Sequence, residues 1–237
     1  MTDEVFEREA YADDRAFYLQ RTFRALLDAM ARPGEVAEIG DRAQGDARDA
    51  EASGLTPSAL MLADVLLDAA TSAAVAGPDG EGAALVLARR THVAPAPAAE
   101  AAVAFVPASV RGEAAAAFVS ELSAGTLADP HLGATCIVAA DTVIGVDRDG
   151  LRTVALSGAS AVGAWRLSGP GIRGTVDVEL DRVDVMGARA ARGDEFPLGI
   201  DLVFVDGAGH VLCLPRTTRA ERIETACDRR EGAAWDM

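Results

Sequence analysis

Two short apolar runs near the end of the chain constrain its fold more than any other feature. Residues 200–205 read Ile-Asp-Leu-Val-Phe-Val and residues 210–214 read His-Val-Leu-Cys-Leu, with an Asp-Gly-Ala-Gly turn between them. Runs of this length and composition around a glycine-containing turn are typical of an antiparallel β-hairpin. Because the first run is almost continuously apolar, we expect it to be a strand that is covered on both faces of its sheet.

The rest of the chain alternates between helical and extended patterns, which is typical of an α/β fold. Apolar residues at helical spacing predict helices over residues 13–31, 57–69, 81–90, 113–122 and 181–192. Apolar and β-branched runs predict strands over residues 72–76, 103–106, 134–140, 151–156, 164–167 and 174–180. We therefore expect a mixed sheet with helices on both sides.

The connections and the domain limits follow from local composition. Thr56 and Pro57 supply an N-cap and a first-turn proline for the second helix. Residues 38–54 are polar and aperiodic, which predicts a surface loop, and the Ala-Pro-Ala-Pro run at 94–97 predicts a stiff connector. We expect one domain over residues 1–237, with a core at about 13–219 and a C-terminal tail at 220–237.

Charge and the lack of long apolar stretches exclude several classes of function. The formal net charge is −15, which repels nucleic-acid phosphates and anionic membranes, so any anionic ligand must meet concentrated arginines. No apolar stretch is long enough to span a bilayer, and the first residues are acidic where a secretory leader would be basic. Three widely separated cysteines fit reduced thiols better than disulfides. We expect a cytoplasmic protein.

The chain has no lysine at all, and its 22 basic residues are all arginines. A pyridoxal phosphate enzyme needs a lysine amine for its internal aldimine, and a Walker A loop needs a lysine on the nucleotide phosphates. Both mechanisms are therefore excluded, although a biased genomic base composition explains the missing lysine well.

A Pro-Arg-Thr-Thr-Arg segment follows the second strand of the hairpin and is the best candidate anion site. It offers the guanidinium groups of Arg216 and Arg219 and the hydroxyl groups of Thr217 and Thr218. This combination suits the oxygens of a phosphate or phosphonate. The alternative is structural: Thr218-Arg219-Ala220-Glu221 matches a capping box for a C-terminal helix, and the arginines would then pair with acidic residues.

Other motifs favour structural roles. Residues 169–174 have the Gly-x-Gly-x-x-Gly spacing of a dinucleotide loop, but a strand pattern follows them, so we expect a tight connection between strands. Asp177 and Glu179 alternate with apolar residues and should lie on the solvent-exposed face of a strand. His210 and Cys213 should lie on opposite faces of their strand, and we expect no metal site.

Arg24 lies in the first predicted helix, and Arg32 directly follows its end, before Pro33. They could contact a partner subunit, although a solvated helix face explains them as well. An edge strand or an exposed helix face could also support a homodimer of the isolated chain.

Three segments carry a resemblance to a known family: residues 23–34 (FRALLDAMARPG), 167–172 (LSGPGI) and 197–219. Together they resemble the PhnH family, which belongs to the bacterial carbon-phosphorus lyase system for phosphonate breakdown, and the resemblance extends from about Phe17 to Arg219. It implies a three-layer α/β/α fold similar in topology to pyridoxal phosphate transferases but without the cofactor. It also implies work with PhnG, PhnI, PhnJ and PhnL subunits in transferring a ribose triphosphate from ATP to a phosphonate, with loss of adenine.

Two hypotheses follow from this resemblance. The first is a supporting subunit with no catalytic residues and no cofactor of its own. The later radical cleavage of the carbon-phosphorus bond uses an iron-sulfur cluster, which needs clustered cysteines that this chain lacks, so that cleavage must occur on another subunit. The second is a stand-alone enzyme or binding protein that holds an anionic ligand through Arg216 and Arg219.

Overall fold

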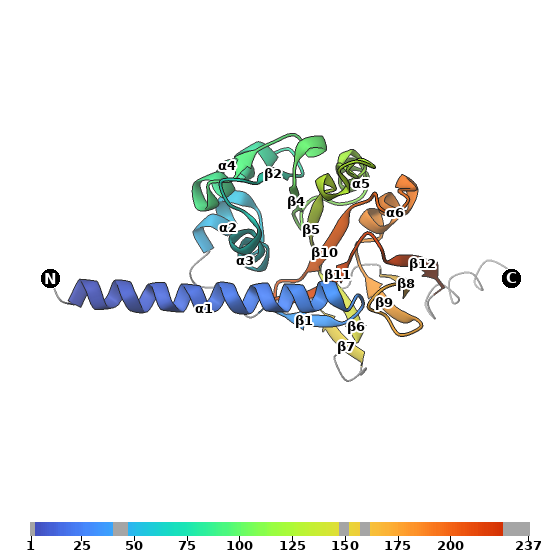
Figure 1. The fold of residues 1–237 in the computed structure, drawn as a ribbon, viewed down its shortest axis with the longest axis horizontal. Helices are drawn as coiled ribbons and strands as arrows, with labels where there is room; N and C mark the ends of the chain where they lie inside the picture. Colours follow the sequence, from blue (N-terminus) through green and yellow to red (C-terminus); the bar gives the residue numbers. More distant parts are fainter. Residues whose placement is uncertain (1–2, 40–46, 147–151, 157–161, 225–237) are drawn as a thin grey trace, which may run out of the picture.

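The computed structural model describes residues 3–39, 47–146, 152–156 and 162–224 (Figure 1). Two β-sheets form its centre. The larger sheet has seven strands in the order β1-β11-β10-β5-β4-β2-β3. Its strands are β1 (Val36–Glu38), β2 (Ser72–Val75), β3 (Ala94–Pro95), β4 (Val103–Val106), β5 (Thr135–Ala139), β10 (Asp201–Val205) and β11 (His210–Leu214).

The hairpin predicted from the two apolar runs is confirmed as β10 and β11. They pair antiparallel from Leu202 opposite Leu214 to Val205 opposite Val211. β10 also pairs in parallel with β5, and β5, β4, β2 and β3 continue as a parallel array. The sheet is therefore mixed, as expected.

Helices cover one face of the large sheet. These are α1 (Asp3–Ala31), α2 (Ala47–Ser53), α3 (Pro57–Leu66) and α4 (Gly80–Thr91), and Figure 1 shows them together on one side. Val203 and Val205 of β10 belong to the same apolar cluster as Leu60 and Leu62 of α3. The predicted cap of α3 is confirmed, because the Thr56 hydroxyl accepts from the N–H of Ala59 at 3.2 Å.

The opposite face of the large sheet is covered by two helices and by a second sheet. The helices are α5 (Glu113–Glu121) and α6 (Val183–Arg192). The second sheet has the order β12-β8-β9-β6-β7 and is antiparallel throughout. Its strands are β6 (Thr142–Val146), β7 (Arg152–Leu156), β8 (Gly163–Ser168), β9 (Val176–Leu180) and β12 (Arg219–Ile223).

This second sheet differs from the expected arrangement of helices on both sides of one sheet. Leu202 and Phe204 of β10 share their apolar cluster with Trp165 of β8 and Met186 of α6. Because side chains alternate along a strand, β10 thus buries one set of residues under α3 and the other under α6 and β8. The α/β class is confirmed, and the layer on this second face is part helix and part sheet.

The two sheets meet closely where β1 approaches β6. The N–H of Val146 donates to the Gly34 carbonyl at 3.0 Å. A Cβ atom at Gly145 would lie only 2.5 Å from that carbonyl oxygen, so this approach requires glycine.

Several local predictions need correction. The predicted loop at 38–54 contains helix α2, and the predicted connector at 94–97 contains the short strand β3. Strand β6 was not predicted at all. Two 3₁₀ turns, η1 (Ala98–Glu100) and η2 (Pro130–Leu132), complete the elements.

The capping box at Thr218 does not start a helix. Residues 219–223 form β12, which pairs antiparallel with β8 from Arg219 opposite Ser168 to Ile223 opposite Ala164. Residues 220–223, which the sequence pattern assigned to the tail, are therefore part of the second sheet. The part of that expected C-terminal helix beyond residue 224 lies outside the described residues.

The glycine-rich segment at 169–174 is a strand connection, as predicted. It joins β8 to β9, and Gly171 within it has a φ of 82°. Within the described part of the chain, no helix is both long enough and apolar enough to cross a membrane.

Candidate functional site

A cleft of about 670 Å³ lies at the C-terminal end of α6. Its walls come from the last turn of α6, from the segment 193–200 that leads into β10, and from residues 216–219, which follow β11 and include the first residue of β12. Pro170 of the β8–β9 connection completes the lining. The four predicted anion ligands, Arg216, Thr217, Thr218 and Arg219, all line this cleft. Sequence reasoning therefore identified one wall of it.

Arg216 is held by protein groups rather than presented to a ligand. Its Nη2 donates to Oδ2 of Asp201 at 2.7 Å, and its Nε lies 3.2 Å from the same oxygen. Its Nη1 donates to the Pro130 carbonyl at 2.6 Å. The structural alternative, in which an arginine pairs with an acidic residue, is thus confirmed for Arg216.

Arg189 is the cation that sequence reasoning missed. It lies in the last turn of α6, and its Nη2 donates to the carbonyls of Pro215 at 3.1 Å and Thr218 at 2.7 Å. No described carboxylate lies within ion-pair distance of it. Burial lowers the pKa of Arg189, and Asp201 and Asp194 oppose this effect. An arginine stays protonated at neutral pH even so.

A signal for Arg189 was present in the sequence. Arg189 follows the buried residues Val185 and Met186 at spacings of four and three, so it lies on the apolar face of its helix. A guanidinium on such a face must find acceptors inside the protein.

Thr218 and Arg219 occupy the same wall in different environments. Thr218 is 2% exposed, and its hydroxyl has no hydrogen-bond partner among the described residues. Arg219, the first residue of β12, is exposed and forms no ion pair with a described residue. Thr217, between Arg216 and Thr218, is half-buried.

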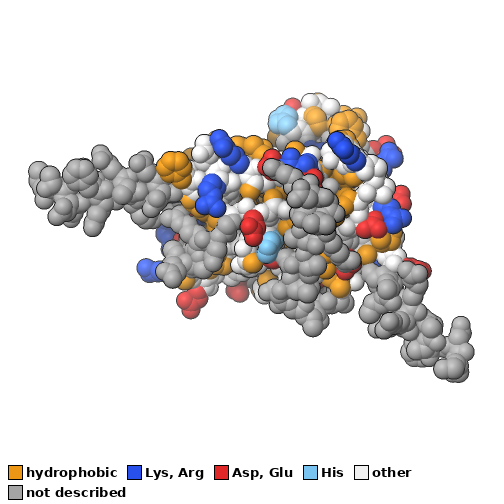
Figure 2. Space-filling model, turned by 90° about the horizontal axis from the view of Figure 1, so that it is seen from below, with side chains coloured by type: hydrophobic (Ala, Val, Ile, Leu, Met, Phe, Trp, Pro, Cys, Tyr) orange, Lys and Arg blue, Asp and Glu red, His pale blue; other side chains and the backbone are white. Residues whose placement is uncertain are grey.

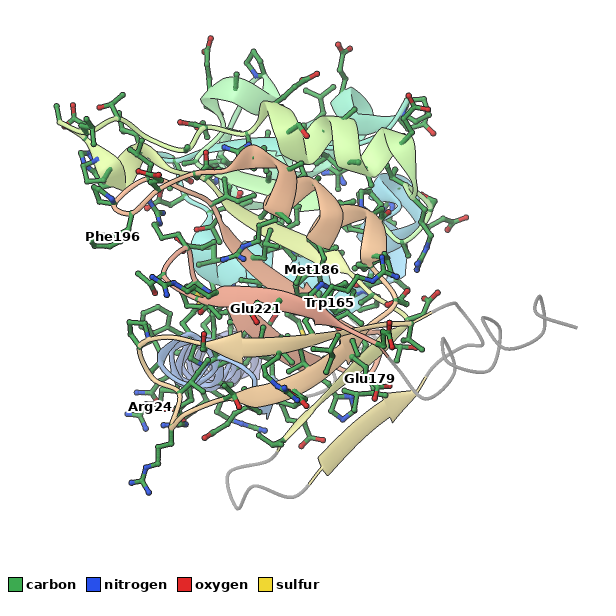
Figure 3. The ribbon with its side chains drawn as sticks, turned by 90° about the vertical axis from the view of Figure 1, so that its right-hand side faces the viewer. Arg24, Trp165, Glu179, Met186, Phe196 and Glu221 are labelled. Carbon is green, nitrogen blue, oxygen red and sulfur yellow. The ribbon has the colours of Figure 1, made fainter. Side chains whose placement is uncertain are left out.

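The remaining wall of the cleft is acidic at one end and apolar along its rim. Asp194 pairs with Nε of Arg192 at 2.7 Å, and Glu195 is exposed. Phe196 is 75% exposed, and Figure 3 shows it at the outer edge of the molecule, on the loop between α6 and β10. Leu198 and Ile200 continue the apolar side.

The other candidate residues are engaged in structural contacts. Asp177 accepts from Nε of Arg166 at 2.8 Å, and the hydrogen bond from Arg166 lowers the pKa of Asp177. Nδ1 of His210 lies 2.8 Å from Oδ2 of Asp206. Within the described ranges, no group of three or more His, Cys, Asp or Glu side chains could hold a metal ion.

Arg24 of α1 and Arg32, which follows α1, lie at the surface. Arg24 is exposed and points away from the body of the protein (Figure 3). Arg32 bridges Asp28 and Glu35 at 3.1 and 2.7 Å. On the face of the molecule in Figure 2, basic, acidic and apolar side chains are interspersed.

The comparison with protein families decides where this chain belongs. The model of the bacterial phosphonate metabolism protein (PhnH) matches residues 10–221. The chain belongs to the PhnH family. For this PhnH-family chain the match includes every residue that lines the cleft, and it ends within β12. A comparison with curated proteins found no match.

Membership of the PhnH family implies a role in phosphonate metabolism. It also confirms the resemblance drawn from the three sequence segments, whose expected limits of about 17 and 219 lie inside the matched range.

Proposed function

We propose that this chain is a cytoplasmic subunit of the carbon-phosphorus lyase system and supports the transfer of ribose triphosphate from ATP to a phosphonate. Its partners would be PhnG-, PhnI-, PhnJ- and PhnL-type subunits. In this step the bond between the ribose C1′ and adenine breaks, a bond forms between C1′ and a phosphonate oxygen, and adenine leaves with a proton. The single observation that carries the proposal is the family match over residues 10–221.

The contacts of the candidate residues support a role in which partners complete the active site. Arg216 is bound to Asp201, Asp177 to Arg166, and His210 to Asp206. Carboxylate and guanidinium groups that are engaged in ion pairs, as Asp177 and Arg216 are, are poorly placed to act as acid, base or nucleophile. The chain also has no lysine, so the proposed relation to pyridoxal phosphate transferases would be one of topology without Schiff-base chemistry.

Reconstitution tests this proposal. Purified subunits are mixed with ATP and methylphosphonate, adenine release is followed by chromatography, and the phosphonate is followed by ³¹P NMR. We expect no turnover by this chain alone and reduced turnover when it is left out of the complete set. Turnover by the isolated chain, or full turnover without it, would contradict a supporting role.

A second candidate function is that of a stand-alone enzyme or binding protein for an anionic ligand. The observation that favours it is the cleft, in which Arg189 has no described carboxylate partner within ion-pair distance. Titration of the isolated chain combined with reconstitution separates the two functions. A stand-alone protein binds or converts its ligand and is not needed for turnover by the other subunits, whereas a supporting subunit is needed for their full turnover.

The proposal includes a homodimer when the partners are absent. Phe17, Phe23 and Leu27 of α1 are 66%, 46% and 50% exposed, which is an unusual amount of apolar surface for one helix. Sedimentation should show a dimer of the wild-type chain that weakens when Phe17 and Phe23 become serine. A monomer at all concentrations would remove this part of the proposal.

A further inference from the structure

We infer that the cleft at the end of α6 binds an organic phosphonate or phosphate, with its anionic group at Arg189, Arg219 and Thr218 and its organic group against Phe196. The general class, an anion with an apolar substituent, comes from the cleft itself. The choice of a phosphonate as the first ligand to test rests on the proposed function.

The charges that line the cleft leave a local positive excess in an acidic protein. Arg216 is neutralised by Asp201, and Asp194 is neutralised by Arg192. The other charged groups in the lining are the positive guanidinium groups of Arg189 and Arg219 and the negative carboxylate of Glu195. Because the whole chain carries a net charge of −15, such an excess marks a place where an anion can approach.

The hydrogen bonds of Arg189 orient its guanidinium without neutralising it. Its two hydrogen bonds with described residues both start from Nη2 and end on the backbone carbonyls of Pro215 and Thr218. Carbonyl groups carry no net charge, and a guanidinium has five N–H donors in a planar fork. Nε and Nη1 make no hydrogen bond with a described residue, so this edge of the fork is left for a tetrahedral anion.

Thr218 provides an independent observation in the same wall. Its hydroxyl oxygen is buried and has no partner among the described residues. Leaving a buried hydroxyl unsatisfied costs stability, so such a group is retained where it has another use. Because Thr218 also lines the cleft, a small rotation of its side chain would bring this hydroxyl to an anion bound there, which could accept its hydrogen bond.

The size and the apolar rim of the cleft favour a ligand larger than inorganic phosphate. A volume of about 670 Å³ lies within the usual range for small-molecule sites. Phe196 is three-quarters exposed on the rim, where an apolar substituent of the ligand would cover it.

Calorimetric titration of the full chain at low ionic strength tests the anionic part of the inference. The probes are methylphosphonate, phenylphosphonate and inorganic phosphate. Arg219→Gln and Thr218→Val should each weaken phosphonate binding about tenfold, as expected for the loss of one hydrogen bond to an ionised group. Arg222→Gln is the matched control, because Arg222 lies on the same strand outside the cleft, and its binding should equal that of wild type.

The Thr218→Val variant distinguishes ligand binding from a structural role. Removing an unsatisfied hydroxyl should leave the melting temperature of the free protein unchanged or higher, while phosphonate binding weakens. Arg189→Gln should also weaken phosphonate binding about tenfold. Because this substitution carries a greater risk to folding, its affinity is compared with wild type only at temperatures where its own unfolding curve shows a folded protein. Unchanged binding in both Arg219→Gln and Thr218→Val would overturn the inference.

The organic part has its own test. Phenylphosphonate should bind more tightly than methylphosphonate, and Phe196→Ala should remove this difference without changing the affinity for methylphosphonate. Inorganic phosphate that binds as well as phenylphosphonate would indicate a site for the free anion and would overturn the organic part.

The control variant tests the cleft as a whole. If Arg222→Gln weakens phosphonate binding as much as Arg219→Gln does, the binding reflects general charge attraction, and the cleft is not the site. Variants that lose phosphonate binding but keep full reconstituted turnover would leave the cleft as a binding site and contradict its link to the proposed function. Variants that keep phosphonate binding would refute only the cleft.

Discussion

Arg216 and Asp201 form a two-pronged ion pair that ties the end of β11 to the start of β10, with Nη2 2.7 Å from Oδ2 and Nε 3.2 Å from it. The same guanidinium reaches the Pro130 carbonyl, 86 residues away in the chain. One arginine thus connects three segments beneath the candidate cleft.

Replacing Arg216 with alanine should lower the free energy of unfolding by about 3 kcal/mol, because it leaves the Asp201 carboxylate without its counter-charge in a largely buried site. Arg216→Lys should restore little of this, since an ammonium cannot form the planar pair and reach Pro130 as well. Urea denaturation measures the effect. A fully stable Arg216→Ala protein would show that the pair is not structural.

Asp184 should make stability depend on pH in the acidic range. Burial opposes its ionisation, but hydrogen bonds from the fully buried Arg182 and from two backbone N–H groups more than offset this and lower the pKa of Asp184 below 3.8. A lowered pKa means that the stabilisation is present above the unfolded value and is lost as pH falls through the folded value.

Asp184→Asn should therefore lower the free energy of unfolding by about 3 kcal/mol at neutral pH, where Arg182 loses its charged partner. The difference from wild type should shrink as the pH falls below about 3.8. Urea unfolding at a series of pH values measures this. Asp177→Asn is the control: its pKa is also lowered, but the pair with Arg166 is exposed, so its effect should be much smaller.

Strand β12 should stabilise the second sheet, so the chain must extend past residue 218. Ala220 packs against the cluster that contains Trp165, and β12 pairs with β8 over five residues. A chain that ends at Glu224 should exceed one that ends at Thr218 by about 3 kcal/mol in unfolding free energy.

Tryptophan fluorescence offers a direct measurement of this difference. Both shortened chains lack Trp235, so Trp165 is the single tryptophan in each. Trp165 is 4% exposed in the intact sheet, and its emission should shift to the red only in the shorter chain. Identical emission and stability in the two chains would rule out a contribution from β12.

The thiols of Cys136 and Cys213 should resist labelling in the native protein. Burial raises the pKa of both thiols, that of Cys136 to about 12, so neither forms the reactive thiolate in mildly alkaline buffer. The test uses a Cys227→Ser variant and a thiol-reactive chromophore. We expect negligible labelling until denaturant is added and then two labels per chain. Rapid labelling of the native protein would contradict the buried positions.

The elements that were predicted well are those whose signals are local. The runs that became β10 and β11 are short, continuous and joined by a four-residue turn, so neighbouring residues carry the whole pattern. The cap of α3 is equally local, because Thr56 and Ala59 are three residues apart. The four residues of the anion-site prediction are also neighbours in sequence, and all four line the cleft.

The errors occurred where distant residues decide the outcome. The Thr-x-x-Glu pattern at Thr218 favours a helix locally, but pairing with β8 satisfies the backbone as a strand. The sequence pattern offered both Arg216 and Arg219 as anion ligands, yet Arg216 is paired with Asp201. Arg189, on another element, has no described carboxylate partner within ion-pair distance.

The amino-acid sequence by itself determined the α/β class, the buried hairpin, the exclusion of lysine-dependent chemistry and the PhnH family. Only the tertiary structure decided that a second sheet covers the far face and that Arg189 and Arg219, rather than Arg216, face the cleft without a paired carboxylate among the described residues. The physical reason is range: hydrophobic periodicity acts between residues a few positions apart, whereas sheet pairing and ion pairing join segments that meet only after the chain has folded.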